Sequence, residues 1–215
     1  MLATTKLTYK YANSKPIFYP DIKVEKGNAL LILGQSGVGK STLLHMLGGL
    51  MPPTAGKVVV NDISMNDLSP KELDKFRGSN IGIVFQKSIF MQALTVKENL
   101  QLCRKLAGLT PNDHRIAEVL ARLGIPHKSN SKPNELSQGE QQRLSIARAV
   151  ISEPSILLAD EPSSALDDEH CLAVTDLLRE QMESENCALI IVTHDQRISD
   201  RFENQLILTP KNKQI

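Results

Sequence analysis

A run of eight residues near the start of the chain has the residue types and spacing needed to bind a phosphate group. Its sequence is Gly34-Gln35-Ser36-Gly37-Val38-Gly39-Lys40-Ser41. The glycines allow successive backbone N–H groups to turn inward toward phosphate oxygens. Lys40 is placed to reach the β- and γ-phosphates of a nucleotide, and Ser41 offers a hydroxyl to Mg²⁺. The pattern therefore predicts a nucleotide-binding loop.

The segments on either side of this run favour the same prediction. Ala29 to Leu33 is apolar and typical of a buried parallel strand, while Ser41 to Leu47 is typical of the start of a helix. A phosphate-binding loop requires this strand–loop–helix order, and the helix directs the positive end of its dipole at the bound anion. A glycine-rich turn without function is the alternative, and the flanking strand and helix argue against it.

Two adjacent acids follow a second apolar strand. Asp160 and Glu161 come directly after Ile156 to Ala159. In folds with parallel strands, ligands bind beyond the carboxyl ends of the strands, so these carboxylates are expected beside the phosphate-binding loop. Asp160 is predicted to bind Mg²⁺, directly or through water, and Glu161 to polarise the attacking water. A simple acidic turn is the alternative for this pair taken by itself.

A third feature is the start of a helix. Ser137 is suited to the N-cap of this helix, and Glu140 stands at the capping-box position. A small hydroxyl, the amide of Gly139 and the helix dipole together form a site for an anion. Any helix can begin in this way, so an ordinary helix start is the alternative.

Composition limits the classes of function. The chain has 215 residues, with 25 Lys and Arg against 24 Asp and Glu and a formal net charge of +1. This balance predicts neither a nucleic-acid-binding face nor an acidic tail. We expect no signal peptide and no membrane-spanning helix, since no segment has the required apolar length. The cysteines are widely spaced, which predicts no zinc site or disulfide framework and fits a reducing cytosol.

Apolar strands alternate with helices along the chain, which indicates an α/β fold with a mainly parallel sheet. Residues 87–155 instead have mostly helical periodicity, so we expect an inserted helical segment between core parts 1–86 and 156–215. The predicted strands are Leu7–Tyr11, Ile17–Val24, Ala29–Leu33, Lys57–Asn61, Ile81–Phe85, Ile156–Ala159, Ala188–Val192 and Gln205–Leu208. The predicted helices are Ser41–Leu47, Leu68–Phe76, Val96–Leu106, Asp113–Leu123, Gln138–Ser152 and Asp168–Glu185.

Taken together, these motifs resemble those of the nucleotide-binding subunits of ABC transporters, and the likeness extends over essentially the whole chain. The motifs stand in the family's order: the phosphate-binding loop Gly34–Thr42, the glutamine loop at Gln86, the signature Leu136–Gln141, the acidic motif ending at Asp160-Glu161, the distal loop Ser164–Asp167 and the switch histidine His194. The resemblance implies an ABC ATPase fold, which is a P-loop NTPase core with an antiparallel β subdomain and an inserted α-helical subdomain.

The resemblance also implies hydrolysis of ATP with Mg²⁺. Lys40 and the loop amides would neutralise the phosphates. Gln86 would sense Mg²⁺ and the water, and His194 would contact the γ-phosphate and position Glu161. The residues implied to act in catalysis are therefore Lys40, Gln86, Glu161 and His194. The implied ligands of Mg²⁺ are Ser41, Gln86 and Asp160. The residues implied to bind ATP are Tyr11, Gly34, Ser36, Gly37, Gly39, Lys40, Ser41, Thr42, Ser137 and Gly139.

The signature departs from the family's usual Leu-Ser-Gly-Gly-Gln. Gln138 and Glu140 replace its third and fifth residues. Ser137 and Gly139 are retained, and in the family these two residues touch the γ-phosphate of ATP bound to the other subunit. We therefore expect the contact between subunits to be kept.

The base of the nucleotide is expected to stack on an aromatic ring. Tyr11 stands where the family places this ring, and the face of a tyrosine can stack on any purine. Tyr9 lies two residues away, on the same face of a strand, and is the alternative.

The resemblance implies partners and a location as well. We expect a homodimer or heterodimer of ABC ATPase subunits that closes on ATP, a separate integral membrane permease, and no nucleic-acid partner. The subunit would be cytoplasmic and attached peripherally to the inner face of the cell membrane through the permease. Leu44 to Leu50 resembles the lipoprotein-releasing and macrolide-efflux branch, so export or lipoprotein release is the expected process.

Two further questions stay open at the level of sequence. Ile89-Phe90-Met91 either packs inside the helical subdomain or lines a groove that receives a cytoplasmic helix of the permease. A soluble ABC ATPase of DNA repair or regulation would share the motifs. Such proteins carry long coiled coils or zinc modules, whereas the inserted segment here is compact and lacks heptads.

Overall fold

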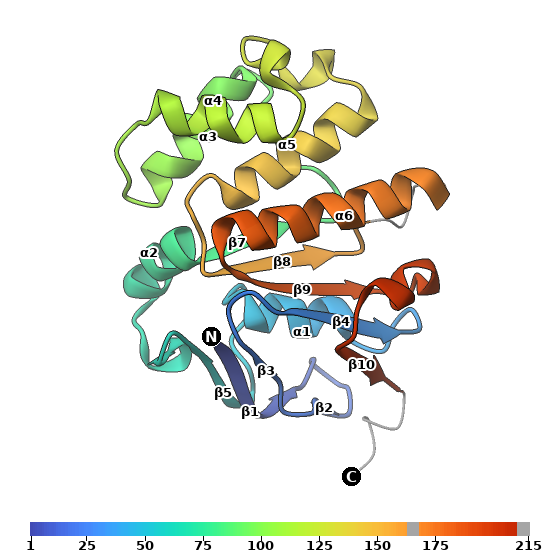
Figure 1. The fold of residues 1–215 in the computed structure, drawn as a ribbon. Helices are drawn as coiled ribbons and strands as arrows, with labels where there is room; N and C mark the ends of the chain where they lie inside the picture. The colour runs from blue at the N-terminus through green and yellow to red at the C-terminus, as the bar shows by residue number, and fades with distance from the viewer. Residues whose placement is uncertain (163–167, 210–215) are drawn as a thin grey trace.

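The computed structural model describes residues 1–162 and 168–209, and its centre is a five-stranded parallel sheet (Figure 1). The long apolar runs of the middle strands explain their burial on both faces. The strand order is β10 (Gln205–Leu208), β4 (Ala29–Gly34), β9 (Ala188–Thr193), β8 (Ile156–Asp160) and β7 (Ile81–Val84). This confirms the predicted α/β core.

Two helices cover opposite faces of this sheet (Figure 1). Successive side chains of a strand point to opposite faces. Leu157 and Ile191 therefore pack in one cluster with α6 (Asp168–Glu185), while Leu158 and Ile190 pack in another with α1 (Lys40–Leu47). The middle strands of the sheet are thus covered on both faces, and its carboxyl edge is the place where ligands of such folds bind.

A second sheet is antiparallel and lies against α1 (Figure 1). Its strands are β1 (Leu2–Tyr9), β2 (Ile17–Phe18), β3 (Lys23–Val24), β5 (Ala55–Val60) and β6 (Ile63–Ser64). The single strand predicted over Ile17–Val24 is wrong, because the segment containing Pro20 separates β2 from β3 and proline donates no ladder hydrogen bond. The first strand also begins earlier than predicted, and β6 was not predicted.

The inserted segment is helical, as expected, and stands on top of the core in Figure 1. It contains α3 (Val96–Leu106), α4 (Asp113–Arg122) and α5 (Gln138–Val150), with α2 (Pro70–Asn80) at the edge of the sheet below. Short 3₁₀ turns complete the described elements at Met65–Asp67, Pro126–Lys128, Pro133–Glu135 and Gln196–Arg201. Every helix within 1–162 and 168–209 is too short or too polar to span a membrane.

A buried cluster of charges joins the helical segment to the core. Arg115 Nη2 of α4 lies 2.6 Å from Glu185 Oε1 at the end of α6, and Arg122 bonds to the same oxygen. Arg115 also donates to the carbonyl of Val150, where α5 ends, over 3.2 Å. The carboxylate of Glu185, whose side chain is only 5% exposed, therefore joins α6 to α4, and Arg115 joins both to the end of α5.

Candidate functional site

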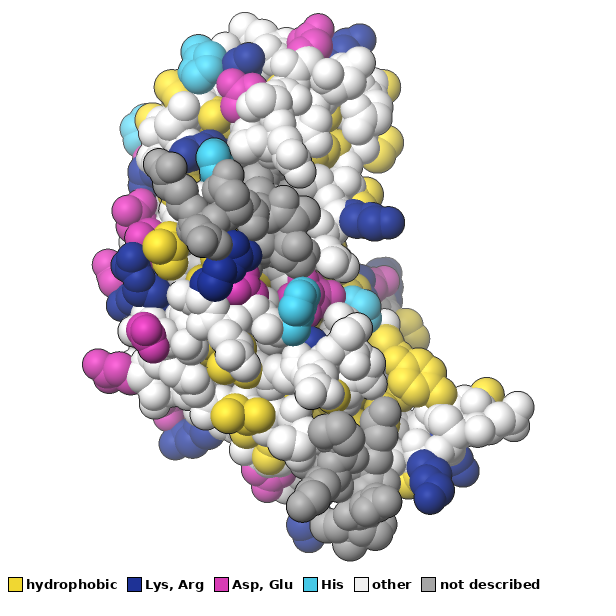
Figure 2. Space-filling view, turned by 90° about the vertical axis from the view of Figure 1, so that its right-hand side faces the viewer, with side chains coloured by type: hydrophobic (Ala, Val, Ile, Leu, Met, Phe, Trp, Pro, Cys, Tyr) yellow, Lys and Arg dark blue, Asp and Glu magenta, His cyan; other side chains and the backbone are white. Residues whose placement is uncertain are grey.

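A cavity of about 360 Å³ opens at the carboxyl edge of the parallel sheet. It lies on the face seen in Figure 2, where histidine and acidic side chains stand together near the middle. Its lining contains most of the residues predicted to bind or act on a nucleotide. The lining residues are Tyr11, Ile17, Ser36, Gly37, Gly39, Lys40, Ser41, Thr42, Gln86, Glu161 and His194.

The loop between β4 and α1 forms the floor of this cavity. Gly39 has a φ of +104°, a conformation that residues with side chains rarely adopt. A Cβ at this position would also lie 2.6 Å from the hydroxyl oxygen of Tyr19. Tyr19 donates to the carbonyl of Gly39 over 3.1 Å and was not predicted, since the sequence does not indicate which aromatic ring supports the loop. Lys40, Ser41 and Thr42, the first residues of α1, line the cavity, and the N-terminus of a helix suits an anion.

Lys40 is almost fully buried in the cavity and has three oxygen partners. Its Nζ donates to the carbonyls of Gly34 and Gln35 over 2.8 and 3.1 Å, and lies 3.2 Å from Glu161 Oε1. An ammonium group has three donors, so these contacts use all of them. A nucleotide phosphate that binds Lys40 would therefore replace one of these partners.

Ser41 and Asp160 bring a hydroxyl and a carboxylate together at one side of the cavity. Ser41 Oγ donates to Asp160 Oδ1 over 3.1 Å. Burial raises the pKa of Asp160, and the neighbouring Glu161 adds to this, while the bond from Ser41 and the charges of His45 and Lys40 oppose it. Burial thus disfavours the charged form of Asp160, and a cation bound beside it would favour that form.

Glu161 receives several donors on one oxygen. Its Oε2 accepts from Thr193 Oγ1 over 2.9 Å and from the backbone N–H of His194 over 3.2 Å, and it lies 2.8 Å from His194 Nδ1. Burial alone would raise the pKa of this carboxyl, but the bonds from His194 and Thr193, with the charge of Lys40, outweigh it and hold the pKa below its usual value. Glu161 is therefore an ionised carboxylate in a fixed position. The role of Thr193 was missed by the sequence prediction.

Of the two tyrosines considered for base stacking, Tyr11 lines the cavity. This residue is 45% exposed, and its hydroxyl lies 2.7 Å from Thr42 Oγ1. Tyr9 instead packs against the core, and its ring makes a T-shaped contact with the ring of Tyr11, with centroids 4.7 Å apart. Tyr11 thus has a free ring surface beside the phosphate-binding loop.

The signature residues lie outside this cavity, at the exposed start of α5. Ser137 is the N-cap, and its hydroxyl accepts from the N–H of Glu140 over 3.3 Å. A Cβ on Gly139 would meet no atom within 4 Å. Glycine lowers the stability of a helix by about 1 kcal/mol relative to alanine. The described neighbours of Gly139 leave room for a side chain, so they do not explain why this position is glycine.

Comparison with known proteins agrees with this geometry. A family model described as ABC transporter matches residues 20–164. The chain belongs to the ABC transporter family. It is an ATP-binding subunit of that family, and it is an ATPase.

The ABC ATPase is similar to curated proteins along most of its length. It is 38% identical over 190 residues to the lipoprotein-releasing system ATP-binding protein LolD of Colwellia psychrerythraea, covering 87% of this chain and 74% of that protein. It is also 38% identical over 180 residues to the ABC transporter ATP-binding protein YtrE of Bacillus subtilis, covering 83% and 78%. These relatives favour a transporter subunit over a soluble ATPase of DNA repair.

A solved structure has the same fold. The ATP-binding cassette MJ0796, in a dimeric post-hydrolysis state bound to ADP and phosphate, superposes on the ABC ATPase with a TM-score of 0.85 and 34% identity. The match covers 98% of this chain and 95% of that one. The distal loop predicted at Ser164–Asp167 lies outside the described residues.

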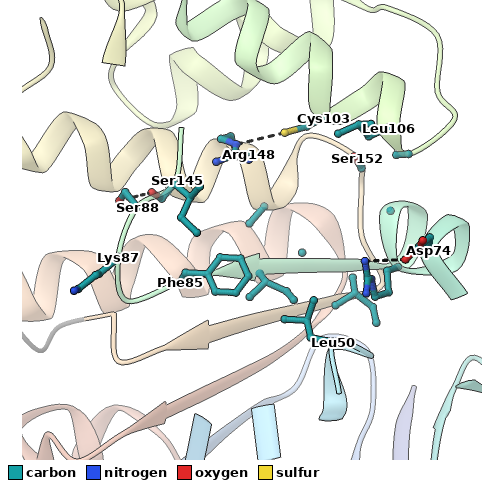
Figure 3. Close-up of a pocket in the computed structure, with 18 residues that line it drawn as sticks. Leu50, Asp74, Phe85, Lys87, Ser88, Cys103, Leu106, Ser145, Arg148 and Ser152 are labelled. Atoms are coloured by element: carbon teal, nitrogen blue, oxygen red, sulfur yellow. Dashed lines mark hydrogen bonds and ion pairs between the residues drawn. The ribbon is translucent and has the colours of Figure 1, made fainter. Parts of the chain in front are cut away.

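A second, larger cavity of about 560 Å³ forms a groove between the core and the helical subdomain of the ABC ATPase (Figure 3). Its walls come from α2, α3, α5 and β7, together with the segment that follows Gln86. The hydroxyl oxygens of Ser88 and Ser145 lie 2.7 Å apart and form a hydrogen bond across one end of the groove. Leu106 at the rim is 72% exposed.

Two roles were considered for Ile89-Phe90-Met91, packing inside the helical subdomain and lining a groove for a partner, and the structure divides the run between them. Ile89 lines the groove and is 66% exposed. Phe90 does not line the groove, and instead packs against the core under the guanidinium of Arg148, whose Cζ lies 5.7 Å from the ring centroid. Met91 is 53% exposed but does not line the groove, so Ile89 is the residue of this run that a partner in the groove can contact.

Proposed function

We propose that this ABC ATPase hydrolyses ATP with Mg²⁺ in a head-to-tail dimer and thereby drives a separate membrane permease. The observation that carries the proposal is the convergence of Lys40, Ser41, Glu161 and His194 on one cavity. These groups come from three separate strand ends and supply a cation for phosphate, a hydroxyl, a carboxylate base and an imidazole. This is the set that phosphoryl transfer to water requires.

Glu161 is the residue proposed to activate water. Phosphoryl transfer is mainly positioning and stabilisation of charge. When a phosphate binds Lys40, Oε1 of Glu161 is released while Oε2 stays bound by Thr193 and His194. The released oxygen can accept a hydrogen bond from the attacking water and orient it, and the ring of His194 can contact the γ-phosphate.

Ser41, Asp160 and Gln86 are the residues proposed to hold Mg²⁺. The hydroxyl and carboxylate are already in contact, and Gln86 lines the same cavity. Magnesium in nucleotide sites is commonly bound by one or two protein oxygens together with phosphate and water, so this donor set fits it. When bound, the ion neutralises charge that develops on the phosphates.

The dimer is proposed because the two halves of an ATP site, the nucleotide cavity and the signature, lie apart from each other within one chain. Ser137 and Gly139 are exposed, lie outside the chain's own cavity and form a helix N-terminus that suits an anion. The superposed cassette MJ0796 is dimeric. We infer that each signature closes the cavity of the other subunit on ATP, in a symmetric pair.

The groove with Ile89 at its rim is proposed to receive a cytoplasmic helix of the permease. An apolar groove beside exposed Leu106 can bury one face of an amphipathic helix. The similarity to LolD supports lipoprotein release or a related export process. Binding of the permease would hold the ATPase at the inner face of the cell membrane.

Replacement of Glu161 tests this proposal. We expect Glu161→Gln to bind ATP, to form an ATP-dependent dimer in sedimentation experiments, and to lose most steady-state hydrolysis. Lys40→Ala measured by itself, which should not bind ATP, is the control for nucleotide-independent association. Hydrolysis by Glu161→Gln at the wild-type rate would contradict the assigned role, and a monomer at high protein and ATP concentrations would contradict the dimer.

A further inference from the structure

Thr193 is a buried residue whose hydroxyl contacts the catalytic candidate Glu161 directly. It is the last residue of β9 and has no exposed surface. Its Oγ1 donates to Glu161 Oε2 over 2.9 Å and accepts from the backbone N–H of Asp195 over 3.0 Å. An ionised carboxylate is only an acceptor, so the hydroxyl proton must point at Glu161, and the N–H of Asp195 fixes the hydroxyl from the other side.

The turn that holds this hydroxyl is itself anchored by charge. Asp195 is 9% exposed, and the guanidinium of Arg197 binds both of its oxygens over 2.8 and 2.7 Å. The thiol of Cys171 on α6 donates to Oδ2 of Asp195 over 3.3 Å. Bidentate contacts of this kind fix orientation as well as position. The backbone N–H that bonds to Thr193 is therefore held in place by a second layer of contacts.

Thr193 and His194 differ in how firmly the protein holds them. The side chain of His194 is 55% exposed, so its ring can turn toward another partner. Thr193 has no exposed surface and pairs with Leu33 of the neighbouring strand β4, and a buried β-branched side chain has little freedom about χ1. Of the two side chains that bond to Glu161 Oε2, only Thr193 is fixed by its surroundings.

Glu161 depends on such support because its backbone conformation is unfavourable. Its φ is +48°, in the left-handed region that residues with a side chain rarely adopt. Its other oxygen faces Lys40, which attracts it toward the phosphate-binding loop. The bond from Thr193 opposes rotation of the carboxylate toward Lys40.

We propose that Thr193 is a positioning residue that aims the carboxylate of Glu161 at the attacking water. This inference rests on the proposed role of Glu161. The hydroxyl keeps Oε2 occupied when the ring of His194 turns to the nucleotide, so that Oε1 is presented to water in one orientation. Thr193 acts through Glu161 and makes no contact with the nucleotide.

The test compares three replacements at this position. Thr193→Val keeps the shape and replaces the hydroxyl by a methyl group, Thr193→Ser keeps the hydroxyl and loses the methyl group, and Thr193→Ala loses both. We expect the Val and Ala variants to lower kcat for ATP by about 10- to 100-fold, the range typical of a misplaced catalytic group. KM for ATP and the affinity for ADP should stay unchanged, and Thr193→Ser should keep kcat within about threefold.

A double variant separates positioning from general damage. Thr193→Val added to Glu161→Gln should cause no further loss of hydrolysis, because the two residues act as one unit. A purely structural role would lower ADP affinity and thermal stability in the Ser variant too, and would overturn the inference. So would wild-type kcat in both Val and Ala variants. If Glu161→Gln itself hydrolyses ATP normally, the proposed function fails; if only the Thr193 variants do, this inference alone fails.

Discussion

Lys40 and Glu161 form a buried ion pair inside the nucleotide cavity, with Nζ 3.2 Å from Oε1 and side chains only 5% and 11% exposed. The carboxylate therefore stands where a phosphate oxygen would compete for the same ammonium group. Binding of a nucleotide must exchange one anion for another, and part of the binding free energy is used to separate this pair.

The first prediction concerns this exchange. Glu161→Gln should bind ADP about fivefold more tightly than the wild type, equivalent to about 1 kcal/mol, because a neutral amide is easier to displace from Lys40 than a carboxylate. ADP is used so that dimer closure on ATP does not add to the measured affinity. Calorimetric titration gives the value, and equal or weaker ADP binding would show that the pair does not compete with phosphate.

The second prediction concerns the stacking ring. Tyr11→Ala should weaken ATP binding by about 1–3 kcal/mol, the range for loss of one stacked base. Tyr11→Phe keeps the ring and loses only the contact with Thr42, so it should stay within about 1 kcal/mol of the wild type. GTP should be accepted as well, since any purine offers a face. A loss in Tyr9→Ala without a loss in Tyr11→Ala would assign stacking to Tyr9.

The third prediction concerns the joint between helical segment and core. Glu185→Ala should lower the free energy of unfolding by about 3–5 kcal/mol, because it leaves two arginines without their buried partner. Glu118→Ala is the matched control, since Glu118 bonds to Arg115 from a side chain that is 43% exposed, and about 1 kcal/mol or less is expected. Urea unfolding measures both, and equal effects would refute the distinction.

The fourth prediction concerns the groove. Ile89→Glu should leave nucleotide binding and hydrolysis by the isolated subunit unchanged, and should reduce assembly with the permease or the stimulation of hydrolysis by it. Ile207→Glu is the control, because Ile207 is 65% exposed, close to the 66% of Ile89, and lies on β10 away from the groove. Normal assembly and stimulation with Ile89→Glu would exclude Ile89 from the coupling surface.

The sequence predicted the parts of the fold that depend on long local patterns. The boundaries of α3 and α6 match because Val96–Leu106 has a capping box at its start and strong helical periodicity, and Asp168–Glu185 is long. The antiparallel sheet was predicted less well, since its strands are short and their pairing is set by distant partners. β3, for example, pairs with the start of β1.

The site was predicted where a motif fixes the spacing of its residues. The loop from Gly34 to Thr42 and the pair Asp160-Glu161 were identified in this way. Thr193, Tyr19 and Arg197 were not, because their roles arise only when separate strands and turns are brought together. Thr193 directly precedes the switch histidine His194. Its position in the sequence does not show that its hydroxyl points at Glu161 instead of into the core.

The separation of the nucleotide cavity from Ser137 has a genetic consequence for the proposed dimer. A subunit with Lys40 replaced has a defective cavity and an intact signature, and a subunit with Ser137 replaced has the reverse. Neither homodimer contains a complete site. When the two are mixed, each heterodimer joins the good cavity of one chain to the good signature of the other. Two inactive alleles of this one gene should therefore complement each other. In the restored heterodimer only one of the two sites should hydrolyse ATP, and it is always the site built from the cavity of the Ser137 variant.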